Sequence, residues 1–467
     1  MVALALGTAA LPGGARAQVR PAARDTTFGT SAPGTGASYW GLILPPPDSV
    51  RAVFGNRPMP LWEGMLVWPY RVISFPLRLV SNGFGETVEF LDEKKVIDRV
   101  GRLLGPRRGP FGVRMQFQAG GLSGFGGGVA LEHDAFFGPS NRFRLYGTST
   151  VNGSHRASLG LRFRVGTTGE IDVGAGYRVR PNARYFGLGP DTDDSNKSFY
   201  RQDLAWLGTS YRHGLGGNVF LGSHLLLSSI GTGLPRDQDK PPITEQFARA
   251  LPAGFDSRSQ GVSLGATLSH VTTVETGRPT RGGIRRLRAT YFRGSGDDDA
   301  AFWTYRVDLQ QFVPLWYRYH VLALRAYLSW IDPVGAKPVP FQRLMTNDDP
   351  DLLRGFRDFR WRDRGMVVFS AEYRWPLWVL TRPDAMGLDL YLLTDVGQVF
   401  GDVEQLSVDN LTFSYGVGVR LLGARGFVLR VEYARSNEQA VWRLRADQIF
   451  QFARGGFFYG RDPVPSR

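Results

Sequence analysis

One pentapeptide of the sequence has the composition of a serine-hydrolase motif. Residues 261–265 read GVSLG and fit the pattern G-x-S-x-G. In such hydrolases the serine lies on a tight turn between a strand and a helix, and an Asp and a His follow it in the chain. Ser263 instead lies inside the alternating, glycine-containing stretch SQGVSLGATLSHV. The sequence therefore predicts a strand residue at this position, and the protein is not expected to be an enzyme.

The residues that could bind a metal or a cofactor are not spaced as they are in known binding motifs. The six histidines are scattered, without an H-E-x-x-H motif, and the chain has no cysteine. The absence of thiols excludes disulfides and thiolate metal sites. The glycine-rich stretch 124–128 lacks the following helix and lysine of a phosphate-binding loop. We expect neither a metal nor a cofactor.

Three charged residues in the last third of the sequence could form an ion-pair cluster. Arg354 lies in the motif LLRGF within a long polar link, Glu372 in AEYRWPL and Asp395 in LLTDVGQVF. If the link folds toward the strands that carry the two acids, Arg354 can form charge-assisted pairs with both carboxylates. The alternative is an ordinary solvated arginine at a loop tip.

Three neighbouring residues complete the predicted feature. Gly355 would permit a sharp backbone turn behind Arg354. Gly397 would leave room on the wall beside Asp395. Together with Phe356 they define what we call the clasp, which comprises Arg354, Gly355, Phe356, Glu372, Asp395 and Gly397.

The elements that would position the clasp are strands. From about residue 112 onward, apolar and aromatic residues alternate with small and charged residues, as in 158–165, 367–375, 413–420 and 427–434. The segments run to about ten to fourteen residues, which suits a tilted crossing of a bilayer. Strands of soluble proteins average about five or six residues.

A sheet in lipid must close, because an open edge would leave backbone groups unpaired. About sixteen strand segments lie between Val113 and Phe452, an even number as expected for a single-chain barrel. The predicted fold is an all-β transmembrane, antiparallel outer-membrane β-barrel with a short N-terminal helical segment. The short links 166–169 and 422–425 are predicted to be periplasmic, and the long links 231–258 and 332–364 extracellular.

The composition agrees with this assignment. The 467 residues carry a formal net charge of +14. No run of about 18 apolar residues follows the N-terminus, which excludes a helical membrane protein. No compact basic domain or recognition helix accompanies the positive charge, so nucleic acid is not an expected partner. Attraction to outer-membrane lipids and lipopolysaccharide, and a basic barrel lumen, explain the charge better.

An ordered series of motifs resembles a known family. LRGF, EYRWPL, TDVGQVF, SYGVGVRL and a Phe-rich last strand are similar to the bacterial surface-antigen barrels of the Bam/Tam-type outer-membrane assembly and translocation superfamily. RYFGLGPDT at 184–192, with the strand that follows, resembles the same group. The resemblance covers about residues 112–452. It implies that Arg354 inserts into the lumen and pairs with Glu372 and Asp395.

The sequence as a whole predicts five regions. A signal peptide at 1–17 ends in the small-x-small motif ARA. A Pro/Gly-rich linker follows at 18–61, then an amphipathic helical periplasmic segment at 62–111, the barrel at 112–452 and a C-terminal extension at 453–467. The segments before the barrel do not read as polypeptide-transport-associated (POTRA) domains, which family members that insert or translocate proteins normally carry.

Three function classes follow. The first is a role in outer-membrane biogenesis or translocation, in which protein or lipid is inserted or transported without covalent chemistry. Its partners would be nascent outer-membrane proteins or periplasmic proteins, and its location the bacterial cell outer membrane. The alternative is a passive diffusion channel with a basic lumen. A lipolytic enzyme rests only on Ser263.

The helical segment yields a first prediction. Its apolar residues are too closely spaced for a free tether, so we expect it to dock at the periplasmic mouth of the barrel. Deleting residues 62–104 should then raise the single-channel conductance and leave barrel folding intact. Unchanged conductance, with labelling of the segment by lipid-phase probes, would place it on the membrane surface instead.

Overall fold

The computed structural model describes most of the second part of the chain, namely residues 110–118, 124–138, 141–273, 279–296, 299–315, 320–347, 352–379, 387–422 and 428–445. The predicted signal peptide, linker, helical segment and C-terminal extension lie outside these residues. Their boundaries therefore remain predictions.

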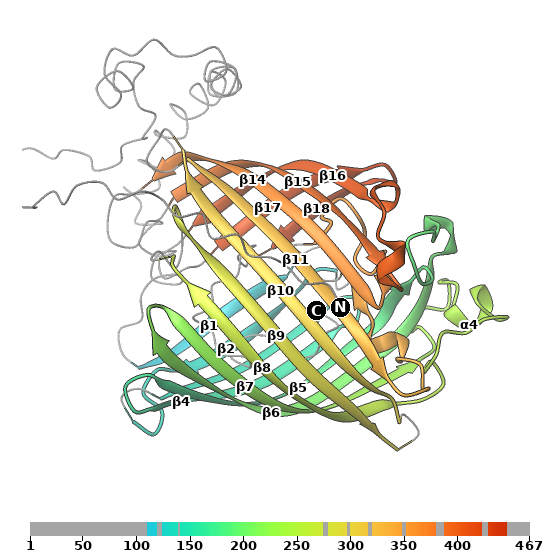
Figure 1. Cartoon of the computed structure of the whole chain (residues 1–467), viewed down its shortest axis with the longest axis horizontal. Coiled ribbons are helices and arrows are strands. Elements are labelled where there is room, and N and C mark those ends of the chain that lie inside the picture. The colour runs from blue at the N-terminus through green and yellow to red at the C-terminus, as the bar shows by residue number, and fades with distance from the viewer. Residues whose placement is uncertain are drawn as a thin grey trace, which may run out of the picture. The chain divides into compact units, whose positions relative to one another are not determined.

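In the described residues sixteen strands form one antiparallel sheet, in which strands pair in the order in which they follow one another along the chain, with β14 next to β11 (Figure 1). The all-β fold and the strand number predicted from the sequence are confirmed. The strands are β1 (Phe111–Gln118), β2 (Gly126–His133), β3 (Arg142–Thr150), β4 (His155–Val165), β5 (Gly169–Tyr185), β6 (Ser198–Gly216), β7 (Val219–Gly233), β8 (Ser259–Val271), β9 (Gly282–Ser295), β10 (Ala301–Pro314), β11 (Val321–Val334), β14 (Gly365–Val379), β15 (Gly387–Phe400), β16 (Thr412–Leu422), β17 (Val428–Ser436) and β18 (Ala440–Arg445).

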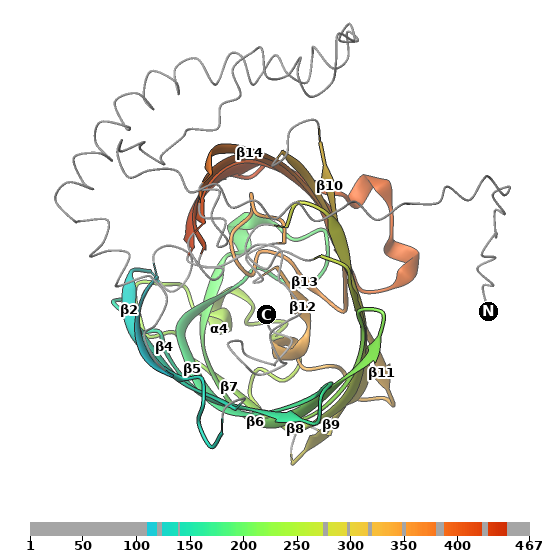
Figure 2. The same cartoon turned by 90° about the vertical axis from the view of Figure 1, so that its left-hand side faces the viewer.

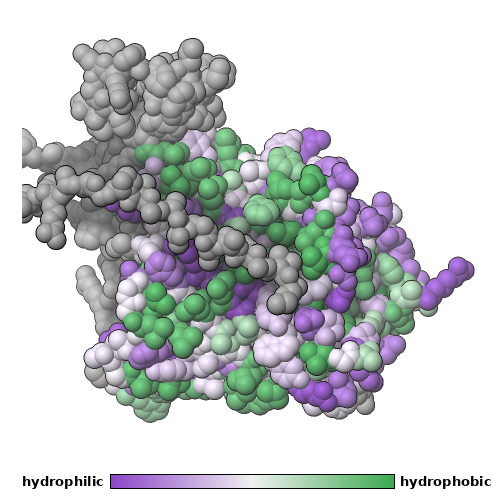
Figure 3. All heavy atoms as spheres, viewed as in Figure 1, coloured by the Kyte–Doolittle hydropathy of each residue, from purple (hydrophilic) through white to green (hydrophobic). Residues whose placement is uncertain are grey.

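The sheet has an apolar outer face and a polar inner face. Phe369, Phe413 and Tyr415 on the outer face are 51–54% exposed, whereas Glu372 and Asp395 on the inner face are fully buried. Figure 3 shows apolar residues gathered over the outer face of the strands. A water-soluble protein would not leave so large an apolar surface open to solvent. The outer face therefore contacts lipid, as the alternation in the sequence predicts.

The sheet curls around an interior, with a short strand at either end (Figure 2). β1 has 8 residues and β18 has 6, whereas β6 has 19. In the described residues β1 pairs only with β2 and β18 only with β17, and no register joins the two ends of the sheet. The predicted closure is therefore not present between the described strands.

Because successive strands are antiparallel, the links alternate between the two ends of the strands. The links at these two ends differ in length. One end carries tight links such as 166–168 and Gly217-Asn218. The two residues of the latter have φ of 57° and 63°, as a type I′ hairpin turn requires. The opposite end carries 186–197, 234–258 and 335–364. The predicted short and long links thus lie at opposite ends, and their periplasmic and extracellular placement stays a prediction.

The link 335–364 folds into the interior of the sheet. It contains a one-turn helix, η2 (Phe341–Arg343), and two short strands, β12 (Met345–Thr346) and β13 (Arg362–Asp363), which pair with each other. Figure 2 shows β12 and β13 inside the ring of strands. Its aromatic residues form the largest buried cluster together with residues of the wall. The ring centroids of Phe341 and Tyr200 of β6, for example, are 5.2 Å apart.

Helices are few and short in the described part. They are η1 (Asp194–Asn196), α4 (Ile243–Gln246), η2, η3 (Val403–Gln405) and η4 (Val408–Asn410). None of these described helices has the length and apolar character needed to cross a membrane.

Ser263 lies in the middle of β8, so the strand predicted for it is confirmed. It is paired in register with Leu226 of β7 and Phe292 of β9. The strand continues to Val271, so there is no strand-to-helix turn at this serine. The histidine nearest in register, His224, has its Nε2 atom 3.3 Å from the hydroxyl oxygen of Thr290. The geometry of a hydrolase nucleophile is not present here.

We therefore predict that Ser263→Ala leaves the protein unchanged. The free energy of unfolding should shift by no more than about 1 kcal/mol, since a single neutral hydroxyl is removed. Thermal unfolding and hydrolysis of a chromogenic ester measure the two quantities. Ester turnover by the parent protein that disappears in the variant would contradict the assignment.

Candidate functional site

Arg354 lies at the tip of the link 335–364, which we call the interior link. Carboxylates bind this arginine on several sides. Its Nη2 and Nε atoms donate to the two carboxylate oxygens of Asp395 at 2.7 and 2.9 Å, and its backbone N–H donates to Asp395 at 2.8 Å. Its Nη1 atom donates to Glu372. All three side chains are fully buried. The structure thus brings together the three charged residues that the sequence predicts to pair.

A third carboxylate, from Glu432 of β17, lies 3.6 Å from Nη1 of Arg354. Two further arginines stand on the strands beside these acids: Arg374 contacts Glu372 at 2.8 Å, and Arg430 contacts Glu432 at 3.3 Å. Three guanidinium groups therefore face three carboxylates. We call these six residues the ion cluster: Arg354, Arg374, Arg430, Glu372, Asp395 and Glu432.

The ion cluster keeps Arg354 charged. Burial alone would lower the pKa of its guanidinium, but the negative charges of Asp395 and Glu372 raise this pKa well above its ordinary value. An arginine that is always protonated needs compensating charge when it is removed from water. The link therefore places a permanently charged guanidinium group beside the acidic side chains on the inner face of the strands.

The backbone around Arg354 approaches the wall closely. A Cβ atom at Gly355 would lie 2.5 Å from the Cβ of Ser414 in β16 and 2.9 Å from the backbone of Arg435 in β17. Gly355 is thus required for close approach, whereas the residue with left-handed backbone is its neighbour Leu353, at φ 51°. For Gly397 the nearest atoms to such a Cβ belong to Val367 and Val368 of β14.

Phe356, the remaining member of the clasp, is fully buried, and its ring centroid is 5.4 Å from that of Trp361. Its carbonyl oxygen accepts a hydrogen bond of 2.7 Å from Arg443 of β18. Arg443 also donates to Asp358 at 2.9 Å. The tip of the interior link is therefore bonded to every strand from β14 to β18 except β16, which it contacts through Gly355.

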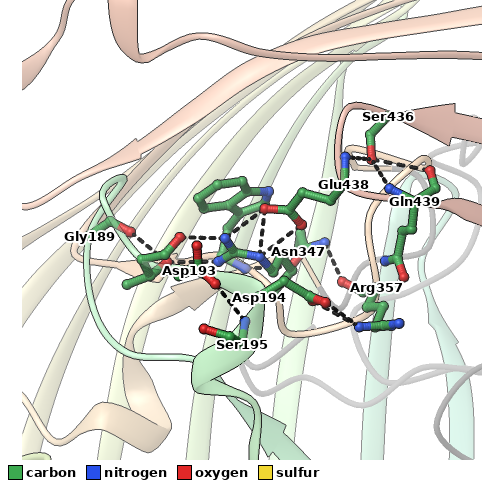
Figure 4. A network of polar contacts seen from close by, with 12 residues as sticks. Gly189, Asp193, Asp194, Ser195, Asn347, Arg357, Ser436, Glu438 and Gln439 are labelled. Carbon is green, nitrogen blue, oxygen red and sulfur yellow. Dashed lines mark hydrogen bonds and ion pairs between the residues drawn. The ribbon is translucent and has the colours of Figure 1, made fainter.

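A second set of contacts joins the interior link to the link 186–197, which contains the end of the RYFGLGPDT segment (Figure 4). Arg357 donates to Asp194 at 2.6 Å. Arg360 donates to the hydroxyl of Thr192 at 2.7 Å and to Glu438, in the link between β17 and β18, at 2.7 Å. Links that are far apart in the sequence are thus bonded together at the end of the sheet that carries the long links.

Asn347 stabilises the fold of the interior link itself. It donates to the carbonyl of Arg357 at 2.9 Å and accepts from the backbone N–H of Trp361 at 3.0 Å. The structure shows that a buried amide holds the two sides of the link together.

The chain matches one protein-family model and several solved structures. The Omp85 superfamily domain matches residues 136–458, which is more than half of the chain. The chain belongs to the Omp85 superfamily. Proteins of this superfamily lie in the bacterial outer membrane, and the apolar outer face described above agrees with this location. The family resemblance predicted from the motifs is therefore confirmed.

The fold is shared with a solved structure at low identity. BamA from Haemophilus ducreyi lacking POTRA domains 1–3 matches with a TM-score of 0.51 and 14% identity, over 73% of this chain and 69% of that chain. CdiB from Acinetobacter baumannii gives a TM-score of 0.44 and 12% identity over 72% of this chain, and CdiB from Escherichia coli 0.48 and 13% over 73%.

The matches span 58% and 63% of the two CdiB chains, which is less than two thirds of each. A search of curated proteins finds no match. The described residues of this Omp85 protein contain no POTRA domain. The prediction that the preceding segments also lack one lies outside them.

Several residues that hold the interior link were not singled out from the sequence. Glu432 and Arg430 were recognised only as members of the polar face of their strand, and Arg443 and Glu438 not at all. The polar face was the available signal for the first two. In the described residues, no group of three or more His, Asp or Glu side chains is arranged to hold a metal ion.

We predict that Arg354→Ala detaches the tip of the interior link. Three fully buried carboxylates would lose a shared cation, and breaking a buried pair in this way costs about 3–5 kcal/mol. Protease access to residues 352–364 should increase, and thermal unfolding and the heat-modifiable gel shift should occur at lower temperature.

Arg357→Ala is the matched control. Arg357 belongs to the same link and also pairs with an aspartate, but both side chains are about one-third exposed, at 31% and 35%. Removing such a pair should cost no more than about 1 kcal/mol. Equal effects of the two substitutions would contradict a special role of the ion cluster.

Proposed function

We propose that this Omp85 protein acts in outer-membrane biogenesis or translocation, with a protein or lipid as cargo and without covalent chemistry. The observation that carries the proposal is the contrast between the two ends of the sheet. Strands β14, β15, β17 and β18 are bonded to the interior link, whereas β1, at the other end of the sheet, has an outer edge that pairs with no strand in the described residues.

This contrast suggests how an incoming segment could be received. An unpaired strand edge presents backbone N–H and C=O groups that can pair with another extended chain. β1 is short, and in the described residues its outer edge has no partner strand. The ion cluster would keep the opposite end of the sheet rigid while the β1 edge accepts a strand. Nascent outer-membrane proteins are the partners that fit this mode best.

The alternative function, passive diffusion through a basic lumen, is supported by the arginines of the inner face. It is opposed by the interior link, which occupies space inside the ring of strands (Figure 2). A large, steady single-channel conductance of the parent protein would favour the channel. Lipids, lipopolysaccharide and periplasmic proteins remain further proposed partners.

We predict that the β1 edge, and not the middle of the sheet, contacts an incoming strand. The chain has no cysteine, so an introduced cysteine is the only one present. Val113→Cys places it on the outer face of β1, and Leu287→Cys on the outer face of β9; the parent side chains are 54% and 49% exposed. A nascent barrel protein with one cysteine in its terminal strand should form a disulfide with the first variant only.

Depletion of the protein provides the accompanying functional measurement. Other barrel proteins should then fail to assemble, and the Val113→Cys variant should restore assembly under reducing conditions. Normal assembly after depletion, or equal cross-linking at both positions, would refute the proposed role.

A further inference from the structure

Aromatic rings gather at the end of the sheet that carries the tight links. Phe136 and Phe137 belong to the link between β2 and β3. The ring centroid of Phe136 is 4.3 Å from that of Phe137, 5.8 Å from that of His133 in β2 and 4.9 Å from that of Phe143 in β3. The ring of His133 is 6.5 Å from that of Phe111 in β1. We call these five residues, Phe111, His133, Phe136, Phe137 and Phe143, the aromatic rim.

The aromatic rim continues the lipid-facing surface of the sheet. His133 is directly opposite Phe111 on one side and Phe143 on the other. Val113, two positions after Phe111 and therefore on the same face of β1, is 54% exposed. Since Phe136 packs against Phe143, the link extends the outer face beyond the ends of the strands and does not turn toward the interior.

Phe137 has a backbone conformation that is unfavourable for its residue type. Its φ of 58° lies in the left-handed region, and the residue is 78% exposed. A Cβ atom is strained in this region, where glycine or asparagine is the usual choice. Both types occur in the same link, as Gly138 and Asn141. The turn thus retains an exposed ring at a position where a smaller residue would be more stable in water.

Hydrogen bonds hold this turn in place. The side-chain amide of Asn141 donates to the carbonyl of Phe137 at 3.0 Å and accepts from the backbone N–H of Arg164 in β4 at 3.3 Å. The backbone N–H of Phe136 donates to the carbonyl of Asn141 at 3.0 Å. The ring of Phe137 is therefore presented by a bonded turn that is joined to the neighbouring strand.

Exposed charged groups lie beside the aromatic rim. Arg142, at the start of β3, forms an ion pair of 3.7 Å with Asp134, and the two side chains are 51% and 44% exposed. Aromatic rings next to exposed polar groups are typical of the boundary between hydrocarbon and headgroups. The tight links 166–168 and Gly217-Asn218 at the same end carry no aromatic residue. The link between β2 and β3 therefore differs from these two.

We propose that the aromatic rim anchors the first three strands in the membrane, with Phe136 and Phe137 in the headgroup region of the leaflet at the tight-link end. The rim is continuous with the outer face that contacts lipid. A stable protein interface takes about 20–30 residues from each partner, which is far more than the rim offers. Lipid contact removes the exposed ring of Phe137 from water, and this offsets the strain of its backbone.

The test uses the full-length protein in phospholipid vesicles. The chain has no cysteine, so Phe137→Cys carries a single nitroxide label at the rim. Thr167→Cys is the matched control, because Thr167 is an exposed residue of the tight link 166–168. Val113→Cys on the outer face of β1 is the lipid reference. Spin relaxation measures collisions with oxygen, which concentrates in lipid, and with a water-soluble nickel complex. The ratio of nickel to oxygen collisions at position 137 should be several times lower than at 167 and close to that at 113.

A second measurement keeps an aromatic ring at the position. The photoreactive amino acid p-benzoylphenylalanine replaces Phe137, or Thr167 as the control, in the full-length protein in cells. Irradiation should join phospholipid to position 137, as detected by mass spectrometry, and not to position 167. The proposal is overturned if position 137 joins instead to another protein or to a second copy of this chain. It is equally overturned if the nickel complex reaches positions 137 and 167 alike. Neither measurement involves assembly of other proteins, so the outcome is independent of the proposed function.

Discussion

The ion cluster around Arg354 is the constraint on which the interior of this protein depends. A guanidinium that cannot lose its proton has been transferred from water to a site with no exposed surface, and three carboxylates compensate it. Such an arrangement is stable only as a whole, since removal of any one charge leaves the others unbalanced. It also requires the glycine at 355, because any side chain there would hold the link away from the acids.

The sequence predicted the architecture well because period-two alternation is a local signal. The alternation in residues such as 413–420 shows which side chains face lipid. The same alternation in their own strands places the acids at 372 and 395 on the inner face. The height of a residue along the barrel wall is not a local property. It depends on strand pairing, which is why Glu432 could be assigned to a face but not brought to Arg354.

The interior link was harder to predict for another reason. Its polar composition is typical of an exposed loop, yet Phe341, Phe356 and Trp361 are buried in the main aromatic cluster. Many of its arginines also donate to backbone carbonyl groups, as Arg362 does to Phe341. Every residue has a backbone carbonyl, so these acceptors leave no pattern in the sequence. The direction in which the link folds can therefore not be predicted from the sequence and is seen only in the packing.

The order of these contacts along the chain affects when they can form. Glu372 and Asp395 follow Arg354 by 18 and 41 residues, and Arg443 follows Asp358 by 85. Every one of these partners is synthesised and exported after the link itself. Whereas each hairpin of the sheet can pair with its immediate neighbour as it appears, the link must wait for the C-terminal strands. A chain that has not yet added its last hairpin therefore lacks Glu432 beside the buried arginine and Arg443 beside Asp358, so the interior of the sheet is completed last.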